Sequence, residues 1–271
     1  MTNLFDVKDK VAVLTGGSGV LGSHMAKGLL SSGAKAVLLG TNEKTLERKT
    51  KELSGIADNV VGLRCDVLNE EQLKKTNETI LKLFGRIDIL INAAGGNRPE
   101  GTIGTDQSVF DLKFEDLRMV TDLNFYGTVL PTLIFGKTMA KQKKGSIINM
   151  SSMATKRAIT RVVGYSAAKS AIDNFTRWMA VEMAQKFGNG IRVNAIAPGF
   201  FLTDQNRTLL TNKDGTLTDR GKTVLSITPF NRFGDPDDLV GAVLWLASDA
   251  SSFVTGTIIP IDGGFSAFSG L

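Results

Sequence analysis

The chain has 271 residues, of which 42% are hydrophobic and 22% are charged, a composition that allows a core of its own and excludes bulk disorder. The formal net charge is +5, but the basic residues are scattered, which favours an enzyme surface suited to an anionic ligand over a nucleic-acid-binding protein. The single Cys65 excludes an intrachain disulfide, and the single His24 argues against a His-based metal site and a Ser-His-Asp triad, so we expect no metal.

Short β-branched runs alternate with longer amphipathic stretches along the chain. In chain order, the pattern predicts a strand over 11–15, a helix over 21–31, a strand over 36–39, a helix over 44–53, a strand over 60–64, a helix over 70–84, a strand over 87–91, a helix over 114–142, a strand over 146–150, a helix over 165–187, a strand over 192–196, a helix over 237–248 and a strand over 257–261.

Strands that are apolar throughout are typical of a parallel sheet covered on both faces. The alternation therefore predicts the α/β class, with a single doubly wound, Rossmann-type parallel sheet and helices on both faces, and one domain over residues 1–271. Two irregular stretches, at about 95–113 and 199–222, follow predicted strand ends. Ligands bind there in such folds, so we expect both stretches to contact substrate.

A glycine-rich turn joins the first strand to the first helix. Gly17, Gly19 and Gly22 match G-x-G-x-x-G in the segment 15–22. Glycines at this spacing allow a tight turn and let backbone N–H groups approach a pyrophosphate at a helix N-terminus. We expect this turn to hold a dinucleotide through Gly16, Ser18, Gly19, Val20, Leu21 and Gly22.

The end of the second strand bears on the choice between NAD and NADP. Folds that bind NAD usually carry a carboxylate there for the ribose 2′-hydroxyl. Residues 39–42, which include Thr41, contain no carboxylate, and the first acidic residue after them is Glu43. Two basic residues, Lys44 and Arg48, follow shortly after. The sequence therefore favours NADP(H) over NAD(H).

Tyr165 and Lys169 stand at i and i+4, which places both side chains on one face of a helix. A phenol normally loses its proton near pH ~10. A neighbouring ammonium stabilises the phenolate, so we expect Lys169 to lower the pKa of Tyr165 and allow proton exchange near neutrality. Alone, such a pair is common on protein surfaces.

Together, these motifs resemble those of the short-chain dehydrogenase/reductase family over nearly the full length. Segment 15–22 is similar to that family's T-G-x-x-x-G-x-G, except that Val20 stands at a glycine position. Asn124 and Ser152 fall at the family's other two catalytic positions, Ser152 thirteen residues before Tyr165, and 262–264 resembles its C-terminal D-G-G. The resemblance implies further cofactor contacts from Thr41, Asp66, Val67, Asn92, Ala93, Ala94, Gly95, Tyr165, Lys169, Pro198, Gly199, Phe201 and Thr203.

The resemblance also implies a role for each member of the catalytic set. Tyr165 would exchange a proton with the substrate oxygen, and Ser152 would hydrogen-bond the same oxygen. Lys169 would bind the nicotinamide ribose and keep Tyr165 acidic, and Asn124 would hold a water. These roles predict an NAD(P)-dependent oxidoreductase that transfers a hydride between nicotinamide and a carbonyl or secondary alcohol.

Within that family, the two substrate loops and the C-terminal segment resemble the D-mannonate oxidoreductase (fructuronate reductase) branch. The resemblance implies interconversion of D-fructuronate and D-mannonate, with a carboxylate bound by Arg98, Arg157, Arg161 or Arg207. Another sugar, polyol or gluconate-type dehydrogenase and a 3-oxoacyl thioester reductase remain alternatives. The substrate contacts we expect are Asn97, Arg98, Ser152, Tyr165, Asn206 and Arg207.

One other class of protein, the cellular setting and the oligomeric state remain to be considered. A non-catalytic dinucleotide sensor would not need the complete set of catalytic residues. The N-terminal ten residues lack the apolar run of a signal peptide, and no stretch approaches the roughly 20 apolar residues of a membrane span, so we expect a cytoplasmic protein. The family resemblance implies a homo-oligomer, a tetramer or dimer, with faces from 114–142 and 165–187.

Overall fold

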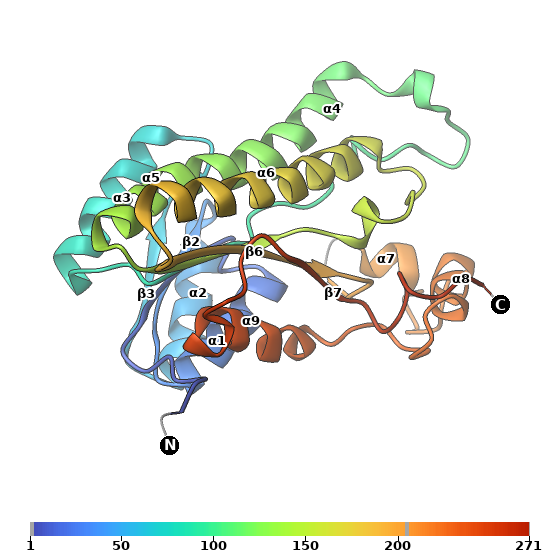
Figure 1. Ribbon diagram of the computed structural model, residues 1–271. Helices are drawn as coiled ribbons and strands as arrows, with labels where there is room; N and C mark the ends of the chain where they lie inside the picture. The colour runs from blue at the N-terminus through green and yellow to red at the C-terminus, as the bar shows by residue number, and fades with distance from the viewer. Residues whose placement is uncertain (1–2, 204–205, 271) are drawn as a thin grey trace.

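A parallel sheet forms the centre of the computed structural model, which describes residues 3–203 and 206–270 (Figure 1). Within that part of the chain the sheet has seven strands, in the order β3 (Val60–Arg64), β2 (Lys35–Gly40), β1 (Val11–Thr15), β4 (Ile89–Asn92), β5 (Gly145–Met150), β6 (Ile191–Pro198) and β7 (Ile258–Ile261). The order reverses between β1 and β4, which is where such folds bind ligands.

Helices cover both faces of the sheet, as Figure 1 shows. One layer contains α1 (Val20–Ser31), α2 (Glu43–Ser54) and α9 (Val240–Ala247), and the other contains α3 (Glu70–Phe84), α5 (Gly127–Gln142) and α6 (Val163–Phe187). The helices α4 (Phe114–Thr121), α7 (Arg207–Leu210) and α8 (Asp219–Ser226) lie beyond one end of the sheet. This arrangement confirms the predicted doubly wound α/β fold.

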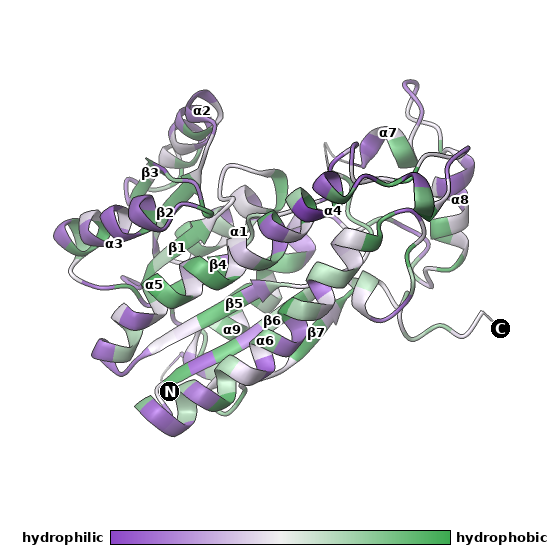
Figure 2. Ribbon diagram, turned by 90° about the horizontal axis from the view of Figure 1, so that it is seen from above, coloured by the Kyte–Doolittle hydropathy of each residue, from purple (hydrophilic) through white to green (hydrophobic). Residues whose placement is uncertain are grey.

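Alternation along the strands creates two cores. Leu14 and Leu38 face the layer of α1 and α9, whereas Val13 and Val37 face the layer of α5 and α6. All four are fully buried, because a parallel strand in this fold has no solvent face. Figure 2 shows the contrast between the hydrophobic strands β1 and β4 and the hydrophilic helices α2 and α3.

The predicted helix over 114–142 is interrupted. A π-helical turn, Asp122–Tyr126, separates α4 from α5. The Asn124 side chain donates to the Val120 carbonyl oxygen at 2.8 Å, which occupies the acceptor that a regular helix offers to a backbone N–H. The periodicity of apolar residues does not register such a turn, so the prediction of one continuous helix is wrong.

The stretch 199–222 is more regular than predicted. It contains α7 and the beginning of α8, although residues 204–205 of the predicted loop lie outside the described part. Thr218 caps α8 by accepting the Gly221 N–H at 3.0 Å, with Asp219 in the first turn. The last predicted helix also differs, because it begins with a 3₁₀ turn, Pro236–Leu239, before α9. No helix in the described residues has the length and hydropathy needed to cross a membrane.

Candidate active site

The turn between β1 and α1 presents an open helix N-terminus. Gly19 is the N-cap of α1, and among the described residues neither a capping side chain nor a first-turn acid satisfies the helix N–H groups. Gly22 packs so closely that a Cβ there would lie 2.3 Å from the Gly16 carbonyl oxygen. A tight turn with unpaired N–H groups suits a pyrophosphate, so the residues present fit a dinucleotide.

Val20, the departure from the family pattern, does not disturb this turn. Gly19 has the extended conformation of an N-cap, with φ −75° and ψ 169°, and Val20 is the first residue of α1. A β-branched residue is acceptable at the start of a helix, because few side chains of a preceding turn crowd it. The helix N-terminus therefore keeps the geometry that a phosphate requires.

The end of β2 carries a hydroxyl and no carboxylate. Thr41 follows the strand and is exposed, whereas the Asn42 side chain accepts the Thr45 N–H at 3.0 Å as the N-cap of α2. Arg64 lies opposite Gly40 in the register of β3 with β2. The Arg64 side chain lines a separate cavity against α2, together with Glu43 and Glu47.

The predicted adenine contacts lie in the turn after β3. Asp66 Oδ1 accepts the Leu68 N–H at 2.9 Å, which fixes its carboxylate within the turn. Val67 is buried, and its Cγ2 would lie 3.0 Å from a Cβ on Gly127. Val67 therefore also contributes to the packing of α5 against this turn.

Asn92, predicted to contact the cofactor, turns its side chain into the protein. Its Nδ2 donates to Thr132 Oγ1 at 2.8 Å and to Asn149 Oδ1 at 2.9 Å, and the residue is 1% exposed. These bonds join β4 to α5 and β5. The next residues form the surface of the site, where the Ala94 N–H donates to Thr15 Oγ1 at 3.1 Å.

Asn124 is fully buried and its side chain is saturated by backbone groups. Its Oδ1 accepts the Gly96 N–H at 3.0 Å, and its Nδ2 donates to the Gly96 and Val120 carbonyl oxygens, each at 2.8 Å. The π turn brings this side chain to the end of β4. In the structure Asn124 thus holds the segment after β4 in place, and its side chain has no spare N–H for a water.

Ser152 lies just after β5, and Tyr165 lies in the first turn of α6. Ser152 Oγ accepts the Ala154 N–H at 3.1 Å, which fixes its oxygen and leaves its O–H able to donate to the Tyr165 oxygen or to a substrate. Burial raises the pKa of Tyr165, and a hydrogen bond with Ser152 only partly offsets this. The expected lowering of the Tyr165 pKa by Lys169 is therefore not met, because desolvation of the phenolate dominates. A raised pKa keeps the phenol protonated at neutral pH.

Lys169 is buried next to Tyr165, one helical turn further along α6. Its Nζ donates to the Met150 carbonyl oxygen at 2.7 Å and lies 5.6 Å from the centre of the Tyr165 ring. Burial lowers the pKa of Lys169 to about 8, and the charge of Asp173 partly opposes the shift. Asp173, one turn further along α6, is buried and hydrogen-bonded by Ser151 Oγ. Sequence reasoning missed Asp173, although its i+4 spacing from Lys169 was a usable signal.

Two cavities meet at these residues. The larger has a volume of about 730 Å³ and the smaller, beside Lys169 and Leu21, about 170 Å³. A dinucleotide on the β1–α1 turn would reach the smaller cavity, because Leu21 in the first turn of α1 lines that cavity. Both cavities are lined by Gly96, Ser152, Tyr165, Pro198, Gly199 and Thr203. The side chains that could exchange a proton thus lie where the two spaces join.

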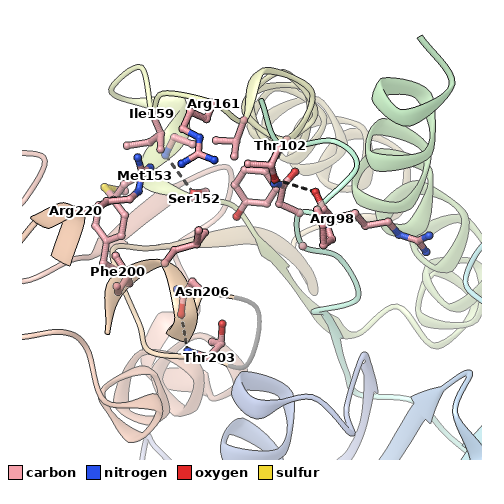
Figure 3. A pocket seen from close by; sticks show the side chains of 18 of the residues that line it. Arg98, Thr102, Ser152, Met153, Ile159, Arg161, Phe200, Thr203, Asn206 and Arg220 are labelled. Atoms are coloured by element: carbon pink, nitrogen blue, oxygen red, sulfur yellow. Dashed lines mark hydrogen bonds between the residues drawn. The ribbon is translucent and has the colours of Figure 1, made fainter. Parts of the chain in front are cut away.

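The predicted substrate residues are distributed unevenly around the larger cavity (Figure 3). Asn97, Arg98 and Asn206 line it, but Asn206 Nδ2 donates to the Phe201 carbonyl oxygen at 2.7 Å and its Oδ1 accepts the Thr203 N–H at 2.8 Å. Its side chain therefore shapes the loop. Arg207 is exposed on α7 and is not part of the cavity lining.

Two other arginines, Arg157 and Arg220, differ from what the sequence led us to expect about the substrate carboxylate. Arg157 donates to the Ser266 carbonyl oxygen at 3.4 Å and to that of Phe268, and it lies over the Phe265 ring at 5.9 Å, so it ties down the C-terminal segment. Arg220 of α8 lines the larger cavity together with Arg161. Sequence reasoning did not single out Arg220, since no local motif surrounds it.

Comparison with known proteins places the chain among oxidoreductases. A family model described as enoyl-(acyl carrier protein) reductase matches residues 18–266. UxuB, an uncharacterised oxidoreductase of Bacillus subtilis (strain 168), is 45% identical over 271 residues, which cover 97% of this chain and 96% of that protein.

Two crystal structures are similar throughout. A Haemophilus influenzae protein with bound NAD, provisionally assigned as a D-mannonate oxidoreductase, has a TM-score of 0.91 at 39% identity, with 98% of each chain covered. An Agrobacterium tumefaciens protein, provisionally assigned as a gluconate dehydrogenase, has a TM-score of 0.88 at 31% identity, with 97% of this chain and 98% of that chain covered.

Proposed function

The chain belongs to the short-chain dehydrogenase/reductase family of oxidoreductases, and we propose that it transfers a hydride between a nicotinamide dinucleotide and D-fructuronate or D-mannonate. The observation that carries this proposal is the meeting of the two cavities at Ser152 and Tyr165. A carbonyl carbon in the larger space and a nicotinamide in the smaller one would face each other beside a proton donor.

Tyr165 is the proton donor in this proposal. Its raised pKa keeps the phenol protonated at neutral pH, which suits reduction of a ketone to an alcohol. The O–H of Ser152 donates to the same substrate oxygen and stabilises the charge that develops on it. When bound, the nicotinamide supplies or accepts the hydride. Lys169 presents its ammonium to the ribose side of the site and stays fixed through the Met150 carbonyl oxygen.

A hexuronate substrate is supported by two independent facts. The Haemophilus influenzae relative, at 39% identity, is provisionally assigned as a D-mannonate oxidoreductase. The larger cavity is lined by Arg98, Arg161 and Arg220, and arginine is well suited to binding a carboxylate. Sugar hydroxyls would meet polar groups such as the Thr102 and Thr203 side chains on the same lining.

A substrate panel tests the proposal directly. Purified protein is assayed with keto-uronates, neutral ketoses and acyl thioesters, each with NADH and with NADPH. We expect the highest kcat/KM with D-fructuronate in reduction and with D-mannonate in oxidation. Good turnover of another substrate, together with no turnover of D-fructuronate or D-mannonate, would overturn the assignment.

We propose a preference for NADP(H), supported by the exposed Thr41 and by the absence of a carboxylate from residues 39–42. The NAD bound to the Haemophilus influenzae relative argues for the opposite preference. Fluorescence titration with NADH and NADPH decides between them. In Thr41→Asp, a carboxylate would repel the 2′-phosphate, so the Kd for NADPH should rise while that for NADH falls. Tighter binding of NADH than of NADPH by the unaltered protein would contradict the proposed preference for NADP(H).

A gluconate-type dehydrogenase is the nearest alternative, supported by the Agrobacterium tumefaciens structure. A 3-oxoacyl thioester reductase is a second alternative, because Ile159, Phe200 and Leu209 give the larger cavity apolar walls. The substrate panel separates these activities. Acyl thioesters would need the apolar walls and no cationic subsite.

We also propose assembly into a dimer or tetramer through α5 and α6. Leu133 of α5 is 51% exposed, and Trp178 and Val181 of α6 are 60% and 55% exposed. Light scattering after size exclusion should give the mass of an oligomer, and Trp178→Glu should lower it. Leu83→Glu on α3 is a matched control, since Leu83 is 54% exposed. A monomeric mass for the unaltered protein would contradict this proposal.

A further inference from the structure

The larger cavity carries an excess of positive charge. Arg98, Arg161 and Arg220 line it, and no aspartate or glutamate that the structure describes is part of the lining. Cations without counter-charges in a partly enclosed space create a positive potential that attracts anions. The three guanidinium groups differ in how the protein holds them and in whether they are free to bind a ligand.

Arg161 is held by a reciprocal contact with the segment after β4. Its Nε donates to the Ile103 carbonyl oxygen at 2.5 Å, and its own carbonyl oxygen accepts the Ile103 N–H at 2.9 Å. The backbone of Arg161 has φ +76°, a conformation that costs a non-glycine residue free energy and occurs preferentially at functional sites. Among residues 3–203 and 206–270, the terminal nitrogens of this guanidinium have no hydrogen-bond partner.

Arg220 approaches from α8, a different segment of the chain. Its Nη1 donates to Thr160 Oγ1 at 3.3 Å, next to Arg161. Burial lowers the pKa of Arg220, and the charge of Arg161 lowers it further. Figure 3 shows both side chains near Ile159. Within the described residues neither guanidinium has a salt-bridge partner, so an anion bound between them would relieve their repulsion.

Arg98 is a weaker candidate. It is exposed, and in Figure 3 its guanidinium extends away from Ser152 and the other two arginines. Arg207 does not line the cavity, and Arg157 is occupied by the C-terminal segment. Two fixed guanidinium groups from separate segments are the arrangement that recognises a carboxylate with both oxygens engaged.

We propose that Arg161 and Arg220 together form the subsite for the substrate carboxylate, in the same cavity as Ser152 and Tyr165. This inference rests on the proposed reduction of a sugar-derived ketone. It narrows the substrate class to carbonyl compounds that carry a carboxylate remote from the reacting carbon. A neutral ketose lacks the group that this subsite binds.

The test compares two substrates that differ only in that group. D-fructuronate has a carboxylate where D-fructose has a hydroxymethyl group. In Arg220→Gln, KM for D-fructuronate should rise on the order of 10- to 100-fold, while any change for D-fructose should be much smaller. Arg220→Lys should recover part of the loss, because it restores the charge without the planar fork. An equal rise for both substrates, or none, would overturn the subsite.

Two further variants and one binding measurement complete the experiment. Lys213→Gln removes an exposed charge from the same stretch of chain and should leave KM unchanged. If Arg207→Gln gives the selective rise instead of Arg220→Gln, the carboxylate binds elsewhere and the proposal is wrong.

Binding can be separated from turnover with D-glucuronate and D-glucose as probes. D-glucuronate should raise the Tm of the unaltered protein more than D-glucose does, and Arg220→Gln should abolish the difference. A difference retained in Arg220→Gln would overturn the subsite. If no ketone is reduced but the selective Tm shift is present and depends on Arg220, the proposed reaction fails and the anion subsite stands.

Discussion

Gly95→Ala is expected to damage both the stability and the chemistry of the protein. Gly95 follows β4 with φ +149°, a region that alanine enters only with strain. A Cβ there would lie 2.6 Å from Asn124 Oδ1 and 3.5 Å from Lys169 Nζ. The added methyl group would therefore clash with Asn124 and reach ordinary van der Waals contact with Lys169.

Backbone strain at residue 95 and displacement of Asn124 together set the expected loss of stability. The backbone strain costs about 1–3 kcal/mol. Asn124 cannot withdraw without weakening its hydrogen bonds to Gly96, each of which contributes about 1 kcal/mol. We therefore expect the free energy of unfolding to fall by about 3–5 kcal/mol. A shift of about 1 Å at a reacting centre can cost about 100-fold in rate, so kcat/KM should fall by at least that order.

Urea unfolding and steady-state kinetics measure the two effects on the same preparation. Gly85→Ala is the matched control, since Gly85 has φ +75° and nothing within 4 Å of a Cβ. It should lose about 1–2 kcal/mol and no activity. If Gly95→Ala and Gly85→Ala behave alike in both measurements, the close contact with Asn124 does not exist in solution and the reasoning is refuted.

Three further outcomes are expected. In Tyr165→Phe, kcat should fall about 10²–10⁴-fold with dinucleotide binding by calorimetry nearly intact; a retained rate would remove Tyr165 from the mechanism. Because burial lowers the pKa of Lys169 from its usual 10.5 to about 8, the unfolded state binds more protons between these pH values, so stability from this group rises with pH there. Relative to Lys169→Met, the unfolding free energy of the unaltered protein should gain up to about 3 kcal/mol across that window, and parallel pH curves would contradict this. Asp173→Asn should lower the Lys169 pKa further and move the alkaline limb of kcat to lower pH, whereas Ser151→Ala should leave that limb in place; identical limbs would show that the Asp173 charge does not act on Lys169.

The fold and the proximity of Tyr165 to Lys169 were predictable because their signals are local in the sequence. Strand β1 has the predicted bounds, since its apolar run records burial on both faces, and the partly buried edge strand β3 has the predicted bounds as well. The i and i+4 spacing of Tyr165 and Lys169 likewise needs only one helix.

Features that depend on distant segments escaped prediction. Arg220 joins Arg161 across 59 positions of chain, and no local pattern encodes that meeting. Asn92 belongs to a recognisable motif, but the direction of its side chain is set by partners on β5 and α5. The π turn at Asn124 arises from a side-chain bond to the Val120 carbonyl oxygen, which hydrophobic periodicity cannot register.

The shared boundary of the two cavities has an evolutionary consequence. Residues that belong to only one of them, such as Lys169 in the smaller and Arg220 in the larger, come from separate parts of the chain. Exchange of the segment that contains α7 and α8 would alter which molecule is selected while the proton donor stays in place. One inherited reaction can in this way diversify into many specificities through changes in a peripheral insertion.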